Sequence, residues 1–244
     1  MLKQLKNNFK NYLDQRYPDW DITIALRYLP IVDLIKREYQ KGQKILEVGS
    51  EITGITPYLG LPVTGLDVGF DYKRQNKLLT PVEGSAAKMP FADNSFDYVL
   101  SVDMLEHLPK NLREKAVTEM LRVSKSRVFL SFPCGKASEA VDKKLDQYFF
   151  VKNGYHYDYL KEHVELGLPD PALVSKVAAA HPDWSLKQVG NTSIWLWELL
   201  LKLGLSNEQV KTSLFRRLLL LLPILKHLNF APAYRQLYIL TKQS

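Results

Sequence analysis

The chain alternates short apolar runs with stretches in which apolar residues recur three or four positions apart. The first pattern is typical of buried strands and the second of helices. The runs predict strands at 44–48, 62–66, 80–83, 97–102, 127–132, 184–189 and 235–241. The periodic stretches predict helices at 1–17, 21–40, 54–59, 110–122 and 170–180, whereas 136–163 shows no clean period. This alternation favours a parallel sheet with helices on both faces.

Two details refine the N-terminal helices. Leu2, Leu5, Phe9 and Leu13 form one stripe of a basic amphipathic helix. Asp21 suits the N-cap of the next helix, and Pro30 predicts a kink or restart within it.

A turn containing two glycines follows the first predicted strand. Gly49 and Gly54 supply flexible backbone between that strand and a helix. A strand, glycine turn and helix present backbone N–H groups to a nucleotide-like ligand. Asp67 ends the next strand and suits a ribose diol. Glu51 replaces the middle glycine of Gly-x-Gly-x-x-Gly, so the motif is incomplete.

Three stretches together resemble a known family. They read KILEVGSEITG at 44–54, EGSAAKMPFADNSFDYVLSVDMLEHLP at 83–109 and RVFLSFPCG at 127–135. With them the chain resembles the class I S-adenosylmethionine-dependent methyltransferases, in particular the type 11 branch that acts on small molecules. The resemblance covers residues 40–136. It implies an α/β, Rossmann-like fold with a mostly parallel seven-stranded sheet, helices on both faces and an antiparallel last strand.

The resemblance also implies how the chain is divided. The strands 184–189 and 235–241 would form an antiparallel hairpin at one sheet edge, with a helical insertion between them. We therefore predict N-terminal helices at 1–40 that pack on the core. A cofactor-binding domain would comprise 41–190 and 234–244, and 191–233 would form an insertion or lid.

The activity implied by the resemblance is methyl transfer from S-adenosylmethionine to a small-molecule, lipid or glycan-like acceptor. Glu47 would face the cofactor's ammonium and Asp67 its ribose. Ser85 stands where the family has an acid for the adenine amino group, and a serine accepts a hydrogen bond more weakly. The predicted cofactor contacts are Glu47, Gly49, Ser50, Gly54, Asp67, Val68, Ser85, Ala86, Met89, Ser101 and Val102.

Acceptor chemistry is expected at the end of the fourth strand, because open α/β sheets bind ligands outside the carboxyl ends of their strands. Asp103, Glu106 and His107 are spaced to share one helix face there. We predict His107 and Asp103 as catalytic residues, with His107 as general base or acceptor contact. The three residues also suit a divalent cation, but we expect no metal. The alternative interpretation is that the acids lie at a helix N-terminus and only complement the helix dipole.

Other residues offer weaker candidates. His156 lies in the aromatic run 155–159 and is a further possible base, although a packed loop is the favoured interpretation. Cys134 is expected to be a small residue at a strand exit.

Charge and hydropathy point away from nucleic acid. The net charge is +7, and residues 200–244 contain seven Lys/Arg against one acid. Nucleic-acid binders usually spread their basic residues over a face that also carries stacking aromatics. Because the basic residues here are concentrated near the C-terminus, we expect no nucleic-acid partner. The apolar segments 194–205 and 214–228 are too short to span a bilayer. Either they pack as a lid, or 194–228 makes a peripheral contact with an anionic membrane surface.

Compartment and rival functions complete the expectations. A single cysteine fits a reducing compartment, and the first residues lack an apolar signal-peptide region, so we expect a cytoplasmic protein. Contact with the inner membrane surface is left open, and the sequence does not fix the oligomeric state. A nicotinamide-dependent dehydrogenase would share the glycine turn but leaves MPFADNSFD unexplained. A catalytically idle methyltransferase-fold scaffold is the alternative that Glu51 and Ser85 favour.

Overall fold

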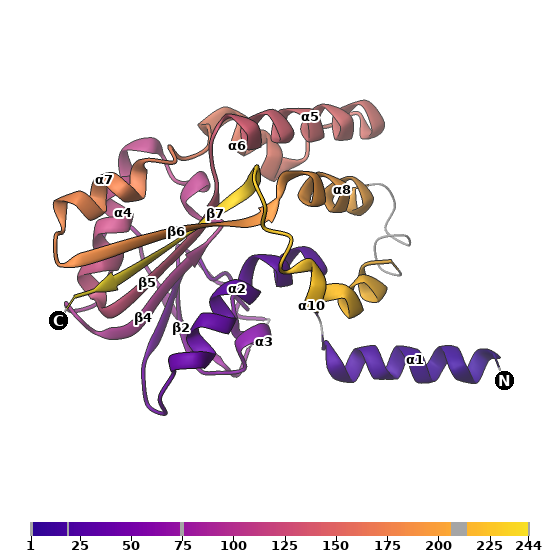
Figure 1. Ribbon diagram of the computed structural model, residues 1–244, viewed down its shortest axis with the longest axis horizontal. Coiled ribbons are helices and arrows are strands. Elements are labelled where there is room, and N and C mark those ends of the chain that lie inside the picture. The colour runs from indigo at the N-terminus through magenta and orange to yellow at the C-terminus, as the bar shows by residue number, and fades with distance from the viewer. Residues whose placement is uncertain (1, 19, 74–75, 206–213, 244) are drawn as a thin grey trace.

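The computed structural model describes residues 2–18, 20–73, 76–205 and 214–243 (Figure 1). Its centre is a seven-stranded sheet in the order β3-β2-β1-β4-β5-β7-β6. The strands are β1 (Ile45–Val48), β2 (Val63–Asp67), β3 (Leu79–Glu83), β4 (Phe96–Val102), β5 (Ser124–Pro133), β6 (Trp184–Ser193) and β7 (Ala233–Lys242). β1 to β5 pair in parallel, and β7 is antiparallel to both β5 and β6. The predicted fold is therefore confirmed.

Helices flank the sheet. They are α1 (Leu2–Arg16), α2 (Ile22–Glu38), α3 (Thr56–Leu59), α4 (Lys110–Val123), α5 (Lys136–Asn153), α6 (Asp158–Leu166), α7 (Leu173–Ala180), α8 (Ile194–Gly204) and α10 (Leu222–Leu225). Two 3₁₀ turns, η1 (Leu105–His107) and η2 (Leu219–Leu221), also lie among the described residues. Residues 214–218 are also helical.

The core lies on both faces of the sheet. Ile31 of α2, Leu196 of α8 and Leu219 pack on one face, whereas Met120 of α4 and Val177 of α7 pack on the other. Figure 1 shows α2, α3 and α10 on the opposite side of the sheet from α4 and α7. Because both faces are covered, the central strands are apolar at successive positions rather than at alternate ones.

The closing hairpin pairs as predicted. Ser185 faces Thr241 and Val189 faces Leu237 across β6 and β7. Asn229 lies near the end of the inserted segment, and its side-chain Oδ1 accepts a hydrogen bond from the Thr192 N–H at 3.0 Å. Leu196 and Leu200 of α8 join the core of one sheet face. The inserted segment thus packs against the sheet through its apolar side.

The N-terminal helices follow the prediction, including the Asp21 cap, except that no restart occurs at Pro30. Asp21 caps α2, accepting hydrogen bonds from the N–H groups of Thr23 and Ile24 at 2.7 and 3.3 Å. α2 runs through Pro30 without a restart. In α1, the side chain of Leu13 is buried. The side chains of Leu2, Leu5 and Phe9 lie outside the described residues.

Two helices replace the aperiodic stretch 136–163. The inward face of α5 includes Ser138, Asp142 and Asp146 beside Val141 and Leu145. Because polar residues occupy core-facing positions, the apolar period that normally marks a helix is absent. α6 then lies against η1, at the carboxyl end of β4.

Among the described residues, no helix is both long enough and apolar enough to cross a membrane.

Candidate active site

Glu47 is a buried carboxylate at the carboxyl end of β1. Its Oε2 accepts a hydrogen bond from the Ile55 N–H at 2.7 Å. Its Oε1 is buried without a hydrogen bond of normal geometry in the described part of the chain. Burial raises the pKa of Glu47 to about 7, partly offset by the Ile55 N–H and the Tyr28 hydroxyl. The site therefore holds an acid whose charge a cationic ligand would stabilise.

The turn after β1 requires its glycines. Gly49 and Gly54 have φ of +78° and +48°, in the region that favours glycine. A Cβ on Gly54 would overlap the Glu47 carboxylate, and one on Gly49 would overlap Met104. The Ser50 hydroxyl donates to the Glu51 carbonyl at 3.0 Å. The helix that follows begins at Thr56, two residues later than predicted, and ends at Leu59 as predicted, where Gly60 adopts a left-handed conformation.

Asp67 joins the ends of β1 and β2. Its carboxylate accepts hydrogen bonds from the N–H groups of Glu51 and Val68, each at 2.8 Å. Glu51 has a left-handed φ of +46°, and its side chain is exposed. Its charge is the largest influence raising the pKa of Tyr159 on α6. The Glu51 side chain is thus exposed to solvent, and its charge acts on α6.

The residues predicted for the adenine side lie in different environments. Val68 is 85% exposed, and Ser85 is also exposed, its hydroxyl accepting from the Ala87 N–H at 3.2 Å. Ala86 is half-buried against the core. Met89 is buried in the core, and its N–H donates to Glu119 at 2.7 Å.

Ser101 and Val102 end β4 beneath these loops. Both are buried, and the Ser101 hydroxyl donates to the Val48 carbonyl at 2.8 Å. This bond fixes the ends of β1 and β4 side by side.

Asp103 is held by two arginines. Its oxygens accept hydrogen bonds from Arg235 Nε at 2.7 and 2.8 Å, and Arg27 Nη1 lies 3.1 Å away. Burial acts to raise the pKa of Asp103, but Arg235 and Arg27 hold it below its usual value. The Arg235 guanidinium also lies 3.9 Å from the ring centroid of Trp197, within cation–π range.

Glu106 and His107 form a separate group from Asp103. Asp103 adopts a left-handed φ of +49° before η1, so the three residues do not share one helix face as their spacing suggested. Glu106 is fully buried, and burial together with the charge of Asp103 raises its pKa well above the usual range. His107 Nδ1 lies 2.8 Å from Glu162 Oε2 on α6.

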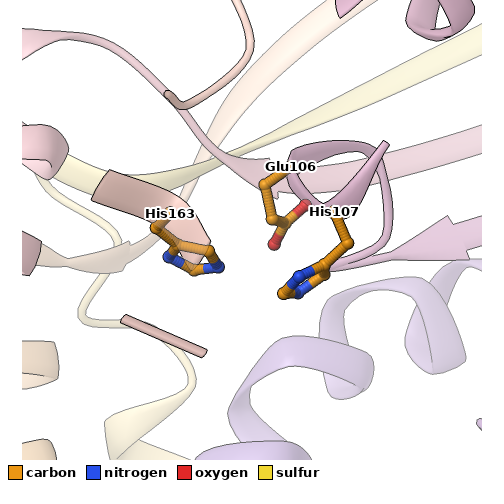
Figure 2. A group of neighbouring side chains, drawn as sticks. All are labelled: Glu106, His107 and His163. Atoms are coloured by element: carbon orange, nitrogen blue, oxygen red, sulfur yellow. The ribbon is translucent and has the colours of Figure 1, made fainter. Parts of the chain in front are cut away.

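His163 of α6 completes this group. Its ring centroid lies 5.1 Å from that of His107, and its Nδ1 lies 2.9 Å from Asp142 Oδ2. Figure 2 shows Glu106, His107 and His163 turned toward one another. By contrast, His156 pairs with Asp146 at 2.8 Å and stacks on Phe150, outside this group.

The tertiary structure thus adds residues that the sequence interpretation did not select. They are Arg27, Asp142, Glu162, His163, Trp197 and Arg235. Arg235 alone gave a signal, as a charged residue at the edge of an apolar strand run. The others lie on α2, α5, α6 and α8, whose docking at the sheet edge no local pattern specifies.

Comparisons with known proteins agree with this geometry. Residues 46–132 match the family model described as a methyltransferase domain. Demethylmenaquinone methyltransferase of Renibacterium salmoninarum is 38% identical over 91 residues, which are 34% of this chain and 38% of that protein. Cycloartenol-C-24-methyltransferase of Arabidopsis thaliana is 31% identical over 172 residues, 64% of this chain and 46% of that protein.

A solved structure extends the likeness to the whole fold. Magnesium protoporphyrin IX methyltransferase from Synechocystis, with bound SAH, superposes with a TM-score of 0.52 at 12% identity, covering 91% of this chain and 84% of that one. The chain spans less than half the length of the two curated relatives named above. The matched motifs confirm the predicted resemblance over residues 46–132: this part of the chain is similar to the S-adenosylmethionine-dependent methyltransferases, and the fold agrees with it.

Proposed function

We propose that the protein transfers a methyl group from S-adenosylmethionine to a small-molecule acceptor. The observation that supports this most directly is the buried Glu47, whose Oε1 lacks a hydrogen bond of normal geometry among the described residues. A buried carboxylate needs all its oxygens satisfied, and Glu47 Oε1 is left for a ligand while Oε2 accepts from the Ile55 N–H. The cationic ammonium of the cofactor's methionine end is such a ligand.

The remaining cofactor roles follow from the positions of the predicted residues. Asp67 would bind the ribose diol through carboxylate lone pairs that its two N–H partners leave free. Gly49, Ser50 and Gly54 would shape the turn around the methionine end, above Ser101 and Val102. Exposed Val68 would cover one adenine face, with Ser85 and Ala86 near its edge. Met89 would support that loop from the core rather than touch the ligand.

The reaction itself needs orientation more than activation. S-adenosylmethionine supplies a methyl group already activated on its sulfonium. Holding an acceptor in line with that methyl carbon is worth about 7–11 kcal/mol. His107 lies beside the β4 end, and a positioned base adds about 10²–10⁴-fold for a hydroxyl acceptor. Asp103, paired with Arg235, would position this wall of the site rather than accept a proton.

The acceptor class proposed from the sequence includes lipid and glycan-like molecules. Trp195, Leu199, Ile224 and Phe230 are all about half exposed or more, and they lie on or beside α8 and α10. Exposed aromatic and aliphatic side chains of this kind favour contact with an apolar acceptor or a lipid surface. The names of the quinone and sterol relatives are compatible with an apolar acceptor.

Calorimetry with S-adenosylhomocysteine tests the cofactor site. We expect binding to the wild type and at least tenfold weaker binding to Asp67→Asn. Asp71→Asn is the matched control, because Asp71 is an exposed carboxylate in the following loop, where it accepts a hydrogen bond from the Lys73 N–H at 3.1 Å. No binding to the wild type, or equal loss in both variants, would contradict the proposed site.

Labelled S-adenosylmethionine tests turnover. The protein is incubated with aqueous, lipid and glycan fractions of a cell extract, and we expect label in one of them. Cofactor binding without labelling of any fraction, across a range of pH, would instead favour the scaffold alternative.

A further inference from the structure

Glu106, His107 and His163 bring three potential metal ligands to one point. Glu106 and His107 come from η1, and His163 comes from α6. One carboxylate oxygen and one nitrogen from each ring all lie within 4.8 Å of one another. In Figure 2 the three side chains point toward a shared space between them.

The atoms that face this space lack partners. Both oxygens of Glu106 and Nε2 of His163 are buried and make no hydrogen bond to any described residue. Glu106 is 0% exposed, so solvent does not satisfy its carboxyl. Buried polar groups are nearly always paired, and a cluster of unpaired ones indicates a missing ligand.

The outer nitrogens of the two rings are already engaged. His107 Nδ1 lies 2.8 Å from Glu162, and His163 Nδ1 lies 2.9 Å from Asp142. The second oxygen of Asp142 accepts a hydrogen bond from the Tyr234 hydroxyl at 2.6 Å. A histidine that donates its Nδ1–H to a carboxylate keeps Nε2 as a free lone pair, which is the arrangement usual behind metal-bound histidines.

We propose that Glu106, His107 and His163 bind a divalent transition-metal ion of the Zn²⁺ class. Two imidazoles and one carboxylate are the ligands of open, catalytic zinc sites, which keep a fourth position for a further oxygen. Calcium and magnesium prefer all-oxygen sites, so the nitrogen ligands disfavour them. Asp103, which the sequence spacing grouped with Glu106 and His107, is instead held by Arg235.

This inference rests on the proposed methyl transfer and specifies its acceptor as one that offers an oxygen. With its lone pair given to the ion, His107 would not act as a base, and the ion would instead supply the acidification of an acceptor hydroxyl. The hydroxyl proton passes to solvent, and an oxygen lone pair forms the bond to the methyl carbon. The carbon–sulfur bond breaks with its electron pair on sulfur, which leaves as a neutral thioether.

The test is titration of chelator-treated protein with Zn²⁺ and Co²⁺, followed by calorimetry and by the visible absorption of Co²⁺. We expect one ion per chain in the wild type. His163→Ala and Glu106→Gln should each bind at least tenfold more weakly. His156→Ala is the matched control, because His156 also pairs with a carboxylate of α5, at 2.8 Å, but lies outside the cluster.

Two further measurements guard against misfolding. Glu106→Gln keeps the shape of the side chain, and circular dichroism should match the wild type. Zn²⁺ should raise the melting temperature of the wild type and of His156→Ala, but not that of Glu106→Gln. Unchanged Co²⁺ binding in a folded Glu106→Gln or His163→Ala variant, or no wild-type binding, would overturn the metal site. Binding of S-adenosylhomocysteine to the metal-free protein is measured in parallel. If it persists while no metal binds, only the metal site is refuted and the proposed function stands.

Discussion

The Glu47 carboxylate accepts a hydrogen bond from the Ile55 N–H at 2.7 Å, and this one contact joins the end of β1 to the far side of the glycine turn. It places an acid inside the turn, between the strand and α3. The same side chain occupies the space that a Cβ on Gly54 would need. The conformation of the turn and the position of the acid are therefore coupled.

Gly54→Ala should lower the stability of the fold by more than the cost of placing a side chain in a left-handed conformation. A side chain at positive φ costs about 1–2 kcal/mol. At Gly54 the added Cβ also overlaps the Glu47 carboxylate, whereas at Gly60, with φ +71°, a Cβ meets nothing within 4 Å. We expect urea denaturation to give a larger loss of stability for Gly54→Ala than for Gly60→Ala. Equal losses would show that Glu47 moves aside at no cost.

Cofactor affinity should fall in acid. Burial raises the pKa of Glu47 to about 7, so its negative form becomes scarce as the pH drops below that value. In the proposed site, only that form would attract the cofactor's ammonium. We expect the dissociation constant for S-adenosylhomocysteine to rise about tenfold per pH unit below the Glu47 pKa. Calorimetry from pH 5 to 8 measures this, at about unit intervals.

Glu47→Gln provides the comparison for that experiment. Its side chain does not ionise, so binding should be weaker and nearly independent of pH. A wild-type affinity that is flat with pH would mean that Glu47 does not contact the ammonium.

Replacing Glu51 by glycine should tighten cofactor binding. Glu51 has φ +46°, and its carboxylate adds negative charge beside the turn. Asn94→Gly is the control, because Asn94 has φ +52° in a remote turn. We expect both variants to relieve backbone strain, but only Glu51→Gly to improve calorimetric binding. Binding to the glycine variant alone would favour the scaffold alternative.

Breaking the Asp103–Arg235 pair should destabilise the fold. Arg235 is 2% exposed and its Nε donates to both Asp103 oxygens. Removing one member of a buried pair costs about 3–5 kcal/mol. We expect that loss for Arg235→Met in chemical denaturation, with part recovered in Asp103→Asn/Arg235→Met.

The exposed pair between Arg122 and Asp93 is the control for this cycle. The Asp93 side chain is 69% exposed. Asp93→Asn should therefore cost less than about 1 kcal/mol. If breaking either pair lowered the free energy of unfolding by a similar amount, burial would not make the Asp103–Arg235 pair more important for stability than an exposed pair.

Any binding to lipid vesicles should depend on apolar side chains more than on charge. Lys202 pairs with Glu198 and Lys226 with Asp33, each at 2.6 Å, and Arg216 pairs with Asp14. Trp195 and Leu199 lie four residues apart on α8 and are about half exposed. We expect the wild type to float with vesicles and the double variant Trp195→Ser/Leu199→Ser not to float. The fraction of wild-type protein that floats should differ little between neutral and anionic vesicles. Protein that never floats, even at low salt, contradicts a membrane contact.

The sequence by itself determined the sheet and the first half of the site. The apolar runs of β1, β2 and β4 are local signals, and Gly49, Gly54 and Asp67 follow them at fixed spacings. Parallel strands bring their carboxyl ends to one edge, so the grouping of Glu47 with Asp67 follows from topology alone.

Only the tertiary structure decided the surroundings of Asp103, Glu106 and His107. α5 places Asp142 and Asp146 on its buried face, which removes the apolar period that would reveal a helix. The pairing of Asp103 with Arg27 and Arg235 joins residues far apart in the sequence, as does the meeting of Glu106 and His107 with His163. Such contacts depend on how α2, α6 and β7 dock, and docking follows from the packing of the whole core rather than from any short stretch of residues.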